Sequence, residues 1–357
     1  MKIRYIILPI FIACVTSCAA QKPIMASSNI DQFLENAEKN LGFHGTVLLI
    51  QGGDTLLYKG YGFSDRKKKI PTNKNIAYNI ASITKGFTAI AILKLVEEGK
   101  LSLQDPLTKY FDNVPKHKTN ITLHHLLTHT SGIGEHYAAD GESDRKKAIQ
   151  KILNLPLTDS VGKRFIYCND GYSLLGIITE LVTGETWESY IKRSILTPLA
   201  MNETFFQNEY SKVDNASVPK LNGRRPGTYK RDYGMIGATG LFSTAIDLAR
   251  FQEALSTNLI LSGRSKELLF GKYRKIKTPG ADTNSYYCYG LFVTEGEAHH
   301  IERIWLRGLE DSWGTAQTNW IPQTKTSLIV LSNSVSLSNG EKPHIYISNE
   351  IIKNLLK

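Results

Sequence analysis

The chain has 357 residues, of which 41% are hydrophobic. This length and composition allow a large core, exclude wholesale disorder and fit one large domain or two ordinary ones. The formal net charge is +10, but the basic clusters are scattered and none adjoins the stacking aromatic residues of a nucleic-acid-binding module, so nucleic acid is not an expected partner.

The first residues predict export. In MKIRYIILPIFIACVTSC two positive charges precede an apolar run that is too short to span a bilayer as a stable helix. Residues 15–18, VTSC, also resemble a bacterial lipobox, in which small residues precede a cysteine that becomes lipidated. We therefore expect a signal peptide at 1–17, a lipidated Cys18 with a tether at 18–27, and a mature protein anchored to a membrane in the periplasm or cell envelope. A plain cleavable signal is the alternative.

Residues 28–80 predict a helix followed by strands. Ser28 or Asn29 can cap a helix that Gly42 ends. The run GTVLLIQGGDTLLYKGYG then reads as two strands joined by a Gly-Gly-Asp turn at 52–54, which indicates a hairpin.

The middle of the chain, about 81–234, carries apolar residues mostly at helical spacing, as in ITLHHLLTHTSG and GYSLLGIITELVTG. Strand-like runs return after Tyr286, in YYCYGLFV, HIERIWLR, AQTNW and TSLIVLSN, before a terminal helix, HIYISNEIIKNLLK. The expected fold is α+β. One antiparallel sheet is built from both ends of the catalytic domain 28–357 (28–80 and about 235–357), flanked by helices, with the mostly helical region inserted. A cleft between sheet and insertion is the natural place for a site.

The helical region opens with a serine three residues before a lysine, Ser82 and Lys85, in YNIASITKGFTAIAILKLVEEGK. Positions three apart share a helix face, so the two side chains can meet. A serine hydroxyl becomes a good nucleophile when a neighbour takes its proton, and a lysine can do so if burial lowers its pKa. Taken alone, this spacing is also that of a helix cap followed by a surface lysine.

A second motif supports the reactive interpretation. In FIYCNDGYSLLG, Tyr167 and Asn169 flank a small residue, and in an extended loop residues two apart point the same way. A phenol that shuttles protons and an amide that holds a carbonyl would then face one space.

With these motifs the chain resembles the serine β-lactamase and penicillin-binding-protein superfamily, in particular its class C β-lactamase-related branch. The resemblance runs from about Gly45 to Asn333, and its segments are ASITKGFTAIAILKLVEEGKLSLQDPL, ITLHHLLTHTSGI, FIYCNDGYSLLG and GATGLFSTAIDLARF. It implies a serine hydrolase without metal or organic cofactor, acting on a small-molecule or peptide substrate, cell-wall peptides included.

The same resemblance implies the roles of individual residues. Ser82 would form an acyl-enzyme, Lys85 would accept or relay its proton, and Tyr167 would be the partner base and the acid for the leaving group. Asn169 would bind the substrate amide. Between these two motif residues, Cys168 is expected to be a packed small side chain, and it and Cys288 are expected to be buried and free.

The third motif of the family departs here. Where the family has Lys-Thr-Gly or His-x-Gly, this chain has Arg307-Gly308-Leu309. Arg307 keeps a positive charge and is expected to bind substrate, whereas Leu309 replaces a glycine beside which substrates lie by strand addition. If Arg307-Gly308-Leu309 occupies the place of the third motif, the resemblance assigns the second oxyanion-binding N–H to the next residue, Glu310.

Two questions stay open from the sequence. The substrate of the hydrolase can be a β-lactam, a D-amino-acid peptide or a small ester or amide, because specificity depends on the shape of loops and pocket. The alternative function is a catalytically weak or inactive envelope-binding protein that has kept the fold. His124, His125 and His129 are assigned to helix packing and capping rather than to a metal site, because no glutamate lies between them as in HExxH.

Overall fold

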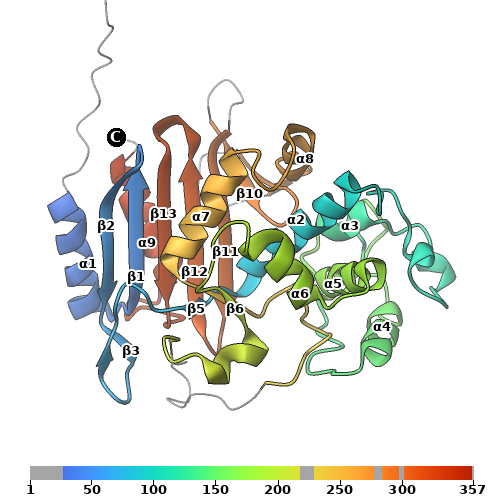
Figure 1. The fold of residues 1–357 in the computed structure, drawn as a ribbon, viewed down its shortest axis with the longest axis horizontal. Coiled ribbons are helices and arrows are strands. Elements are labelled where there is room, and N and C mark those ends of the chain that lie inside the picture. Colours follow the sequence, from blue (N-terminus) through green and yellow to red (C-terminus); the bar gives the residue numbers. More distant parts are fainter. Residues whose placement is uncertain (1–26, 218–228, 277–283, 297–300, 356–357) are drawn as a thin grey trace, which may run out of the picture.

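A computed structural model describes residues 27–217, 229–276, 284–296 and 301–355, and its centre is an antiparallel sheet covered by helices on both faces (Figure 1). The sheet has eight strands in the order β2-β1-β13-β12-β11-β10-β9-β8. The strands are β1 Gly45–Gln51, β2 Asp54–Tyr61, β8 Arg274–Ile276, β9 Asn284–Tyr287, β10 Phe292–Glu295, β11 Ile301–Glu310, β12 Gly314–Ile321 and β13 Thr326–Ser332. The predicted fold class is confirmed.

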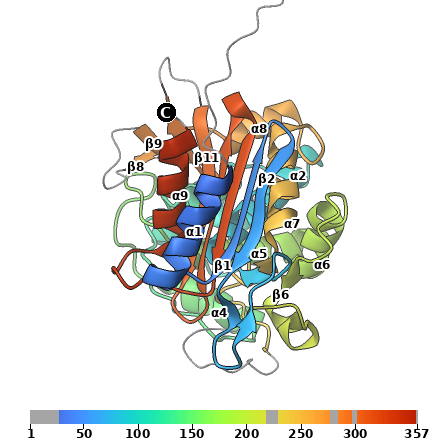
Figure 2. The same cartoon turned by 90° about the vertical axis from the view of Figure 1, so that its left-hand side faces the viewer.

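Strands from the two ends of the chain lie side by side in this sheet. Strand β1 pairs with β13 in a register that sets Gly45 opposite Ser332. Helices α1 (Ser27–Leu41) and α9 (Pro343–Leu355) lie side by side on one face (Figure 2). Val47 and Leu49 of β1 pack in the same core cluster as these helices, whereas Leu48 packs in the larger cluster on the other face. Burial on both faces explains why β1 reads as a continuous apolar run.

The helical region packs against the opposite face. Its elements include α3 Leu123–Leu127, α4 Arg145–Leu153, α5 Asn169–Thr183 and α6 Trp187–Ile191, while α7 Ala245–Ser256 and α8 Gly263–Leu269 follow it in the chain. Helix α2 (Thr84–Glu97) runs between this region and the sheet and contacts α5, α6 and α8. It is buried nearly all round, which accounts for its uniformly apolar sequence.

Short strands complete the fold and tie the region before α2 to the chain after residue 200. They are β3 Phe63–Asp65, β4 Ile70–Pro71, β5 Tyr78–Asn79, β6 Phe205–Phe206 and β7 Leu241–Ser243, and β5, β7 and β6 form a small sheet of their own. The structure therefore fixes the entry to α2 from two sides.

Two expectations need correction. YYCYGLFV is not one strand, because Cys288 N–H donates to the Leu291 carbonyl (2.9 Å) and Gly290 adopts φ +70°, so the chain turns between β9 and β10. The helix in ITLHHLLTHTSG ends at Leu127, before its glycine. Cys168 and Cys288 are buried and free, as expected. Within the described residues, no helix is long and apolar enough to cross a membrane.

Candidate active site

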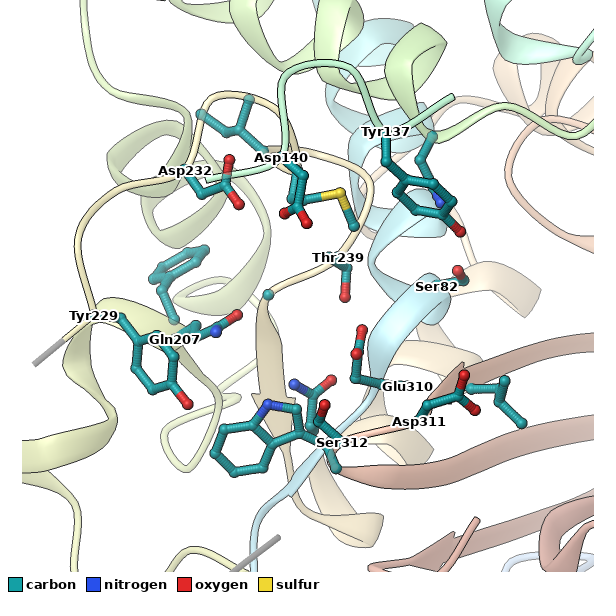
Figure 3. Close-up of a pocket in the computed structure, with 18 of the residues that line it drawn as sticks. Ser82, Tyr137, Asp140, Gln207, Tyr229, Asp232, Thr239, Glu310, Asp311 and Ser312 are labelled. Atoms are coloured by element: carbon teal, nitrogen blue, oxygen red, sulfur yellow. The ribbon is translucent and has the colours of Figure 1, made fainter. Parts of the chain in front are cut away.

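A cleft opens between the end of β11 and the helical region (Figure 3). Five of the predicted site residues line it, namely Ser82, Tyr167, Asn169, Arg307 and Glu310. Lys85 lies beneath it with 1% of its surface exposed. The structure therefore brings together residues that are up to 228 positions apart in the chain (82 to 310). The predicted lipidation site, Cys18, lies outside the described residues.

Ser82 lies in a short 3-10 turn, Ala81–Ile83, that leads directly into α2. The preceding Ala81 adopts φ +44°, a conformation that is strained for a residue with a Cβ. The turn is held by Asn79, whose Oδ1 accepts the Ala81 N–H (2.7 Å), and by the Ile80 N–H, which donates to the Leu241 carbonyl (3.0 Å). The serine is thus presented to the cleft by a rigid backbone.

Strand β11 passes directly against this turn. A Cβ added at Gly308 would lie 2.1 Å from the carbonyl oxygen of Ile80, so only glycine allows the approach. The close contact explains why residue 308 is a glycine, and it fixes the distance between β11 and Ser82.

Lys85 meets three oxygen atoms. Its Nζ lies 3.1 Å from Ser82 Oγ, 2.5 Å from Asn169 Oδ1 and 3.0 Å from the Ala238 carbonyl oxygen. Burial lowers the pKa of Lys85 to about 7, although the negative charge of Glu135 opposes this. A neutral amine has two N–H groups and one lone pair. The two carbonyl-type oxygens can accept the N–H groups, and the lone pair is then left for the Ser82 hydroxyl.

Tyr167 lies beside the lysine, with Lys85 Nζ 4.8 Å from the centre of its ring. Burial raises the pKa of Tyr167 above its usual range, while a hydrogen bond with Ser82 acts in the opposite direction. The phenol therefore keeps its proton at ordinary pH and can donate or relay it.

Two residues that sequence reasoning missed orient Asn169. Glu135 Oε1 accepts a hydrogen bond from Asn169 Nδ2 (2.8 Å) and another from the Tyr137 hydroxyl (2.7 Å). This contact turns the amide so that Oδ1 faces Lys85. Both residues lie in GEHY, at 134–137, directly after the HTSGI segment. This position next to a segment that resembles the family was the signal in the sequence that could have identified them.

Successive side chains of β11 at the third motif point to opposite faces of the sheet. Leu306 packs toward Gly86 of α2, and the guanidinium of Arg307 lies 5.4 Å from the Trp305 ring on the other face. Among the described residues Arg307 forms no salt bridge. The pairing with Glu310 or Asp311 that would make it purely structural is therefore not observed.

None of the described strands pairs with the edge of β11 beside Ser82. The register joins β10 to β11 only as far as Trp305, opposite Phe292, so residues 306–310 pair with β12 alone among the described strands. Leu309 is 41% exposed there. Burial and the charges of Asp311 and Asp140 raise the pKa of Glu310, whose side chain faces the same space as Ser82 and Thr239 (Figure 3).

The three histidines have the packing and capping contacts that were expected. His125 Nδ1 accepts the Thr122 N–H (3.1 Å) at the start of α3, and His124 Nδ1 lies 2.7 Å from the Tyr289 hydroxyl. His129 packs under Tyr167. The described residues contain no group of three or more His, Cys, Asp or Glu that could hold a metal ion.

Comparison with known proteins agrees with this geometry. The Beta-lactamase family model matches residues 30–348. PbpX of Bacillus subtilis (strain 168), a protein named among the penicillin-binding proteins, is 34% identical over 269 residues, which cover 74% of this chain and 66% of PbpX. Penicillin-binding protein 4* of the same organism is 30% identical over 334 residues, which cover 87% of this chain and 72% of that protein. This chain thus spans slightly less than two thirds of PbpX and nearly three quarters of the second relative.

A solved structure gives the same result for the whole fold. The octameric penicillin-binding protein homologue from Pyrococcus abyssi superposes with a TM-score of 0.79 at 31% identity. The superposition covers 93% of this chain and 78% of that one.

Proposed function

The chain belongs to the beta-lactamase family of serine hydrolases, and we propose that it cleaves amide or ester acyl groups through an acyl-enzyme on Ser82. The observation that carries the proposal is the position of Lys85. Its buried amine, with a pKa lowered to about 7, lies 3.1 Å from the serine hydroxyl. A general base must be within hydrogen-bond reach of the proton that it takes, and its pKa must lie near the working pH.

Acylation follows from this geometry. The lone pair of neutral Lys85 accepts the hydroxyl proton while Ser82 Oγ forms a bond to the substrate carbonyl carbon, and the π electrons of that carbonyl move onto its oxygen. The backbone N–H groups of Ser82 and Glu310 would stabilise this oxyanion, assisted by the positive end of α2.

The leaving group then needs a proton. Tyr167, whose pKa is raised by burial, donates it to the departing nitrogen or oxygen and is reprotonated through Lys85. A water molecule attacks the acyl-enzyme with the same groups in reversed roles, which releases the acid and restores the Ser82 hydroxyl. Asn169 would bind the substrate amide.

Two features bear on the substrate. The cleft has a volume of about 1720 Å³, larger than the roughly 300–1,000 Å³ of most small-ligand sites. The unpaired edge of β11 can accept an extended peptide-like chain. We therefore favour peptide-like amides and esters over very small esters, with β-lactams as the competing class.

The proposed location follows from the N-terminal sequence. We propose that the protein is exported and that Cys18 is lipidated, which anchors it to a membrane of the cell envelope. The lipobox-like VTSC at 15–18 supports this proposal.

Intact-mass labelling tests the proposed activity, with a fluorophosphonate and, separately, a fluorescent penicillin. We expect the wild type to gain one fluorophosphonate adduct and Ser82→Ala to gain none. Labelling by penicillin as well would add β-lactams to the substrates. A folded wild type that neither reagent labels would favour the envelope-binding alternative, and labelling that survives in Ser82→Ala would refute the assignment of the nucleophile.

A further inference from the structure

His129 occupies an unusual position for a histidine. It follows α3 with φ +56°, at a helix end where glycine or asparagine is normally favoured, and its side chain is 1% exposed. The side chains of its two neighbours, Thr128 and Thr130, are hydrogen-bonded to each other, with 2.8 Å between their hydroxyl oxygens. A strained residue that the fold holds in place is a reason to look for a function.

Its contacts enclose one residue of the active site. The His129 carbonyl accepts the Ile166 N–H (2.8 Å), and His129 Nδ1 accepts the Cys168 N–H (3.1 Å). Between these bonds, the ring of Tyr167 lies with its centre 4.3 Å from that of the imidazole. His129 therefore holds the tyrosine in three ways. Its carbonyl binds the backbone before Tyr167, and its imidazole binds the backbone after Tyr167 and packs against the tyrosine ring.

The imidazole must be neutral to make these contacts. Because Nδ1 accepts an N–H, the ring proton is on Nε2. The groups that face the ring are Lys85 of α2, Tyr172 of α5, Tyr287 of β9, and Phe165 and Tyr167 of the intervening loop. No carboxylate is among them. Burial and then the charge of Lys85 hold the pKa of His129 well below its usual value.

We infer that His129 is the positioning residue for Tyr167: it aims the phenol at Ser82 by fixing the backbone on either side of that tyrosine. The inference rests on the proposed function, in which Tyr167 moves a proton. His129 itself makes no contact with Ser82 among the described hydrogen bonds, so its effect on the reaction passes through the tyrosine.

Two substitutions separate this role from simple packing. His129→Asn tolerates a positive φ and offers Oδ1 as an acceptor for the Cys168 N–H, whereas His129→Gly tolerates the same φ without an acceptor. Since a displacement of about 1 Å in a catalytic group can cost on the order of 100-fold, we expect His129→Gly to lower kcat for a short-chain p-nitrophenyl ester by about 30- to 100-fold. KM should stay within about threefold, and His129→Asn should keep a kcat at least about tenfold above that of His129→Gly.

A matched control comes from α3, the helix that precedes His129. His124 is half-buried, and its Nδ1, like that of His129, has one partner, but none of its ring contacts involves Tyr167. His124→Asn should lower the melting temperature while kcat stays within about threefold of the wild type. A loss of kcat in His124→Asn as large as in His129→Gly would assign both effects to packing and overturn the inference.

A double-mutant cycle keeps the test valid if His129→Gly does not fold. If His129 acts only through Tyr167, adding His129→Asn to Tyr167→Phe should cost less than about threefold beyond Tyr167→Phe alone. If the kcat losses of the two single variants multiply in the double variant, the inference is overturned. It is also overturned if His129 variants keep the wild-type kcat while Tyr167→Phe is impaired. Wild-type kcat in Tyr167→Phe itself would instead refute the proposed role of the tyrosine.

Discussion

Lys85 shows how one buried group can set the working pH of a site. It is the only member of the Ser82–Lys85–Tyr167 group whose pKa lies near neutrality, since burial lowers it to about 7 and raises that of Tyr167. The two carbonyl-type oxygens that accept its N–H groups favour a neutral amine with its lone pair toward Ser82. Protonation would remove that lone pair.

We therefore predict that kcat/KM rises with pH through about 7 and falls about tenfold for each pH unit below it, because only the neutral amine can take the serine proton. Glu135→Gln should move this limb to lower pH, since the charge of Glu135 raises the pKa of Lys85. Lys85→Met, which keeps the bulk and loses the amine, should lose the limb together with most of the activity. Steady-state kinetics from pH 5 to 9 measure all three, and an unchanged limb in Lys85→Met would assign it to another group.

Arg307 is placed to select substrates by charge. Its guanidinium lies over the rings of Trp305 and Phe292, lines the cleft and has no carboxylate partner among the described residues. A guanidinium fork suits a carboxylate. A charged hydrogen bond of this kind is worth about 1.5–3 kcal/mol, so Arg307→Ala should lower kcat/KM by roughly ten- to 150-fold for substrates with a carboxylate near the scissile carbonyl.

The neutral methyl ester of the same substrate should lose little. Arg303→Ala is the matched control, because Arg303 also lies over the Trp305 ring, 5.7 Å from its centre, but does not line the cleft. Equal losses for the acid and the ester would show that Arg307 only shapes the end of the strand.

The site depends on how closely β11 approaches the turn that carries Ser82. We predict that Gly308→Ala destabilises the protein by about 1–3 kcal/mol, the usual cost of forcing an extra methyl group into a packed core, because its Cβ would lie 2.1 Å from the Ile80 carbonyl oxygen. Fluorophosphonate labelling should slow as well, since relief of the clash moves the Ser82 turn. Gly263→Ala, with nothing within 4 Å of its Cβ, is the control and should be neutral or slightly stabilising in urea titration. Equal stability of the two variants would contradict this account of Gly308.

Part of the site and of the fold could be predicted from the sequence. Ser82 with Lys85 and Tyr167 with Asn169 are short local patterns, so the resemblance of the surrounding segments could identify them. Glu135 and His129 could not be identified in this way, because their bonds to Asn169 and Cys168 join positions 34 and 39 residues apart. The split of YYCYGLFV into β9 and β10 was missed because Gly290 lies inside an apolar run whose periodicity does not reveal a turn.

The sheet built from both chain ends holds the cleft together. Helix α2 supplies Lys85, the segment before α5 supplies Tyr167, and β11 supplies Arg307. These elements meet only when the helical region has docked onto the sheet. Helix α1 contacts β2 at the far end of that sheet, away from the helical region (Figure 1). A tether that precedes α1 therefore joins the molecule at a distance from the cleft.

The last prediction concerns this tether. If Cys18 is lipidated, the wild type should partition into the detergent phase with membranes, and Cys18→Ser should release the protein or block its processing. Residues 18–27 extend at most about 36 Å, and α1 lies away from the cleft, so a variant that begins at Ser27 should hydrolyse a soluble ester with the kcat of the anchored protein. Phase partitioning, intact mass and kinetics of both forms measure this. A wild type found wholly in the aqueous phase and cleaved elsewhere than before Cys18 would establish the plain signal peptide, and a kcat that differs between the forms would show that the tether does more than anchor.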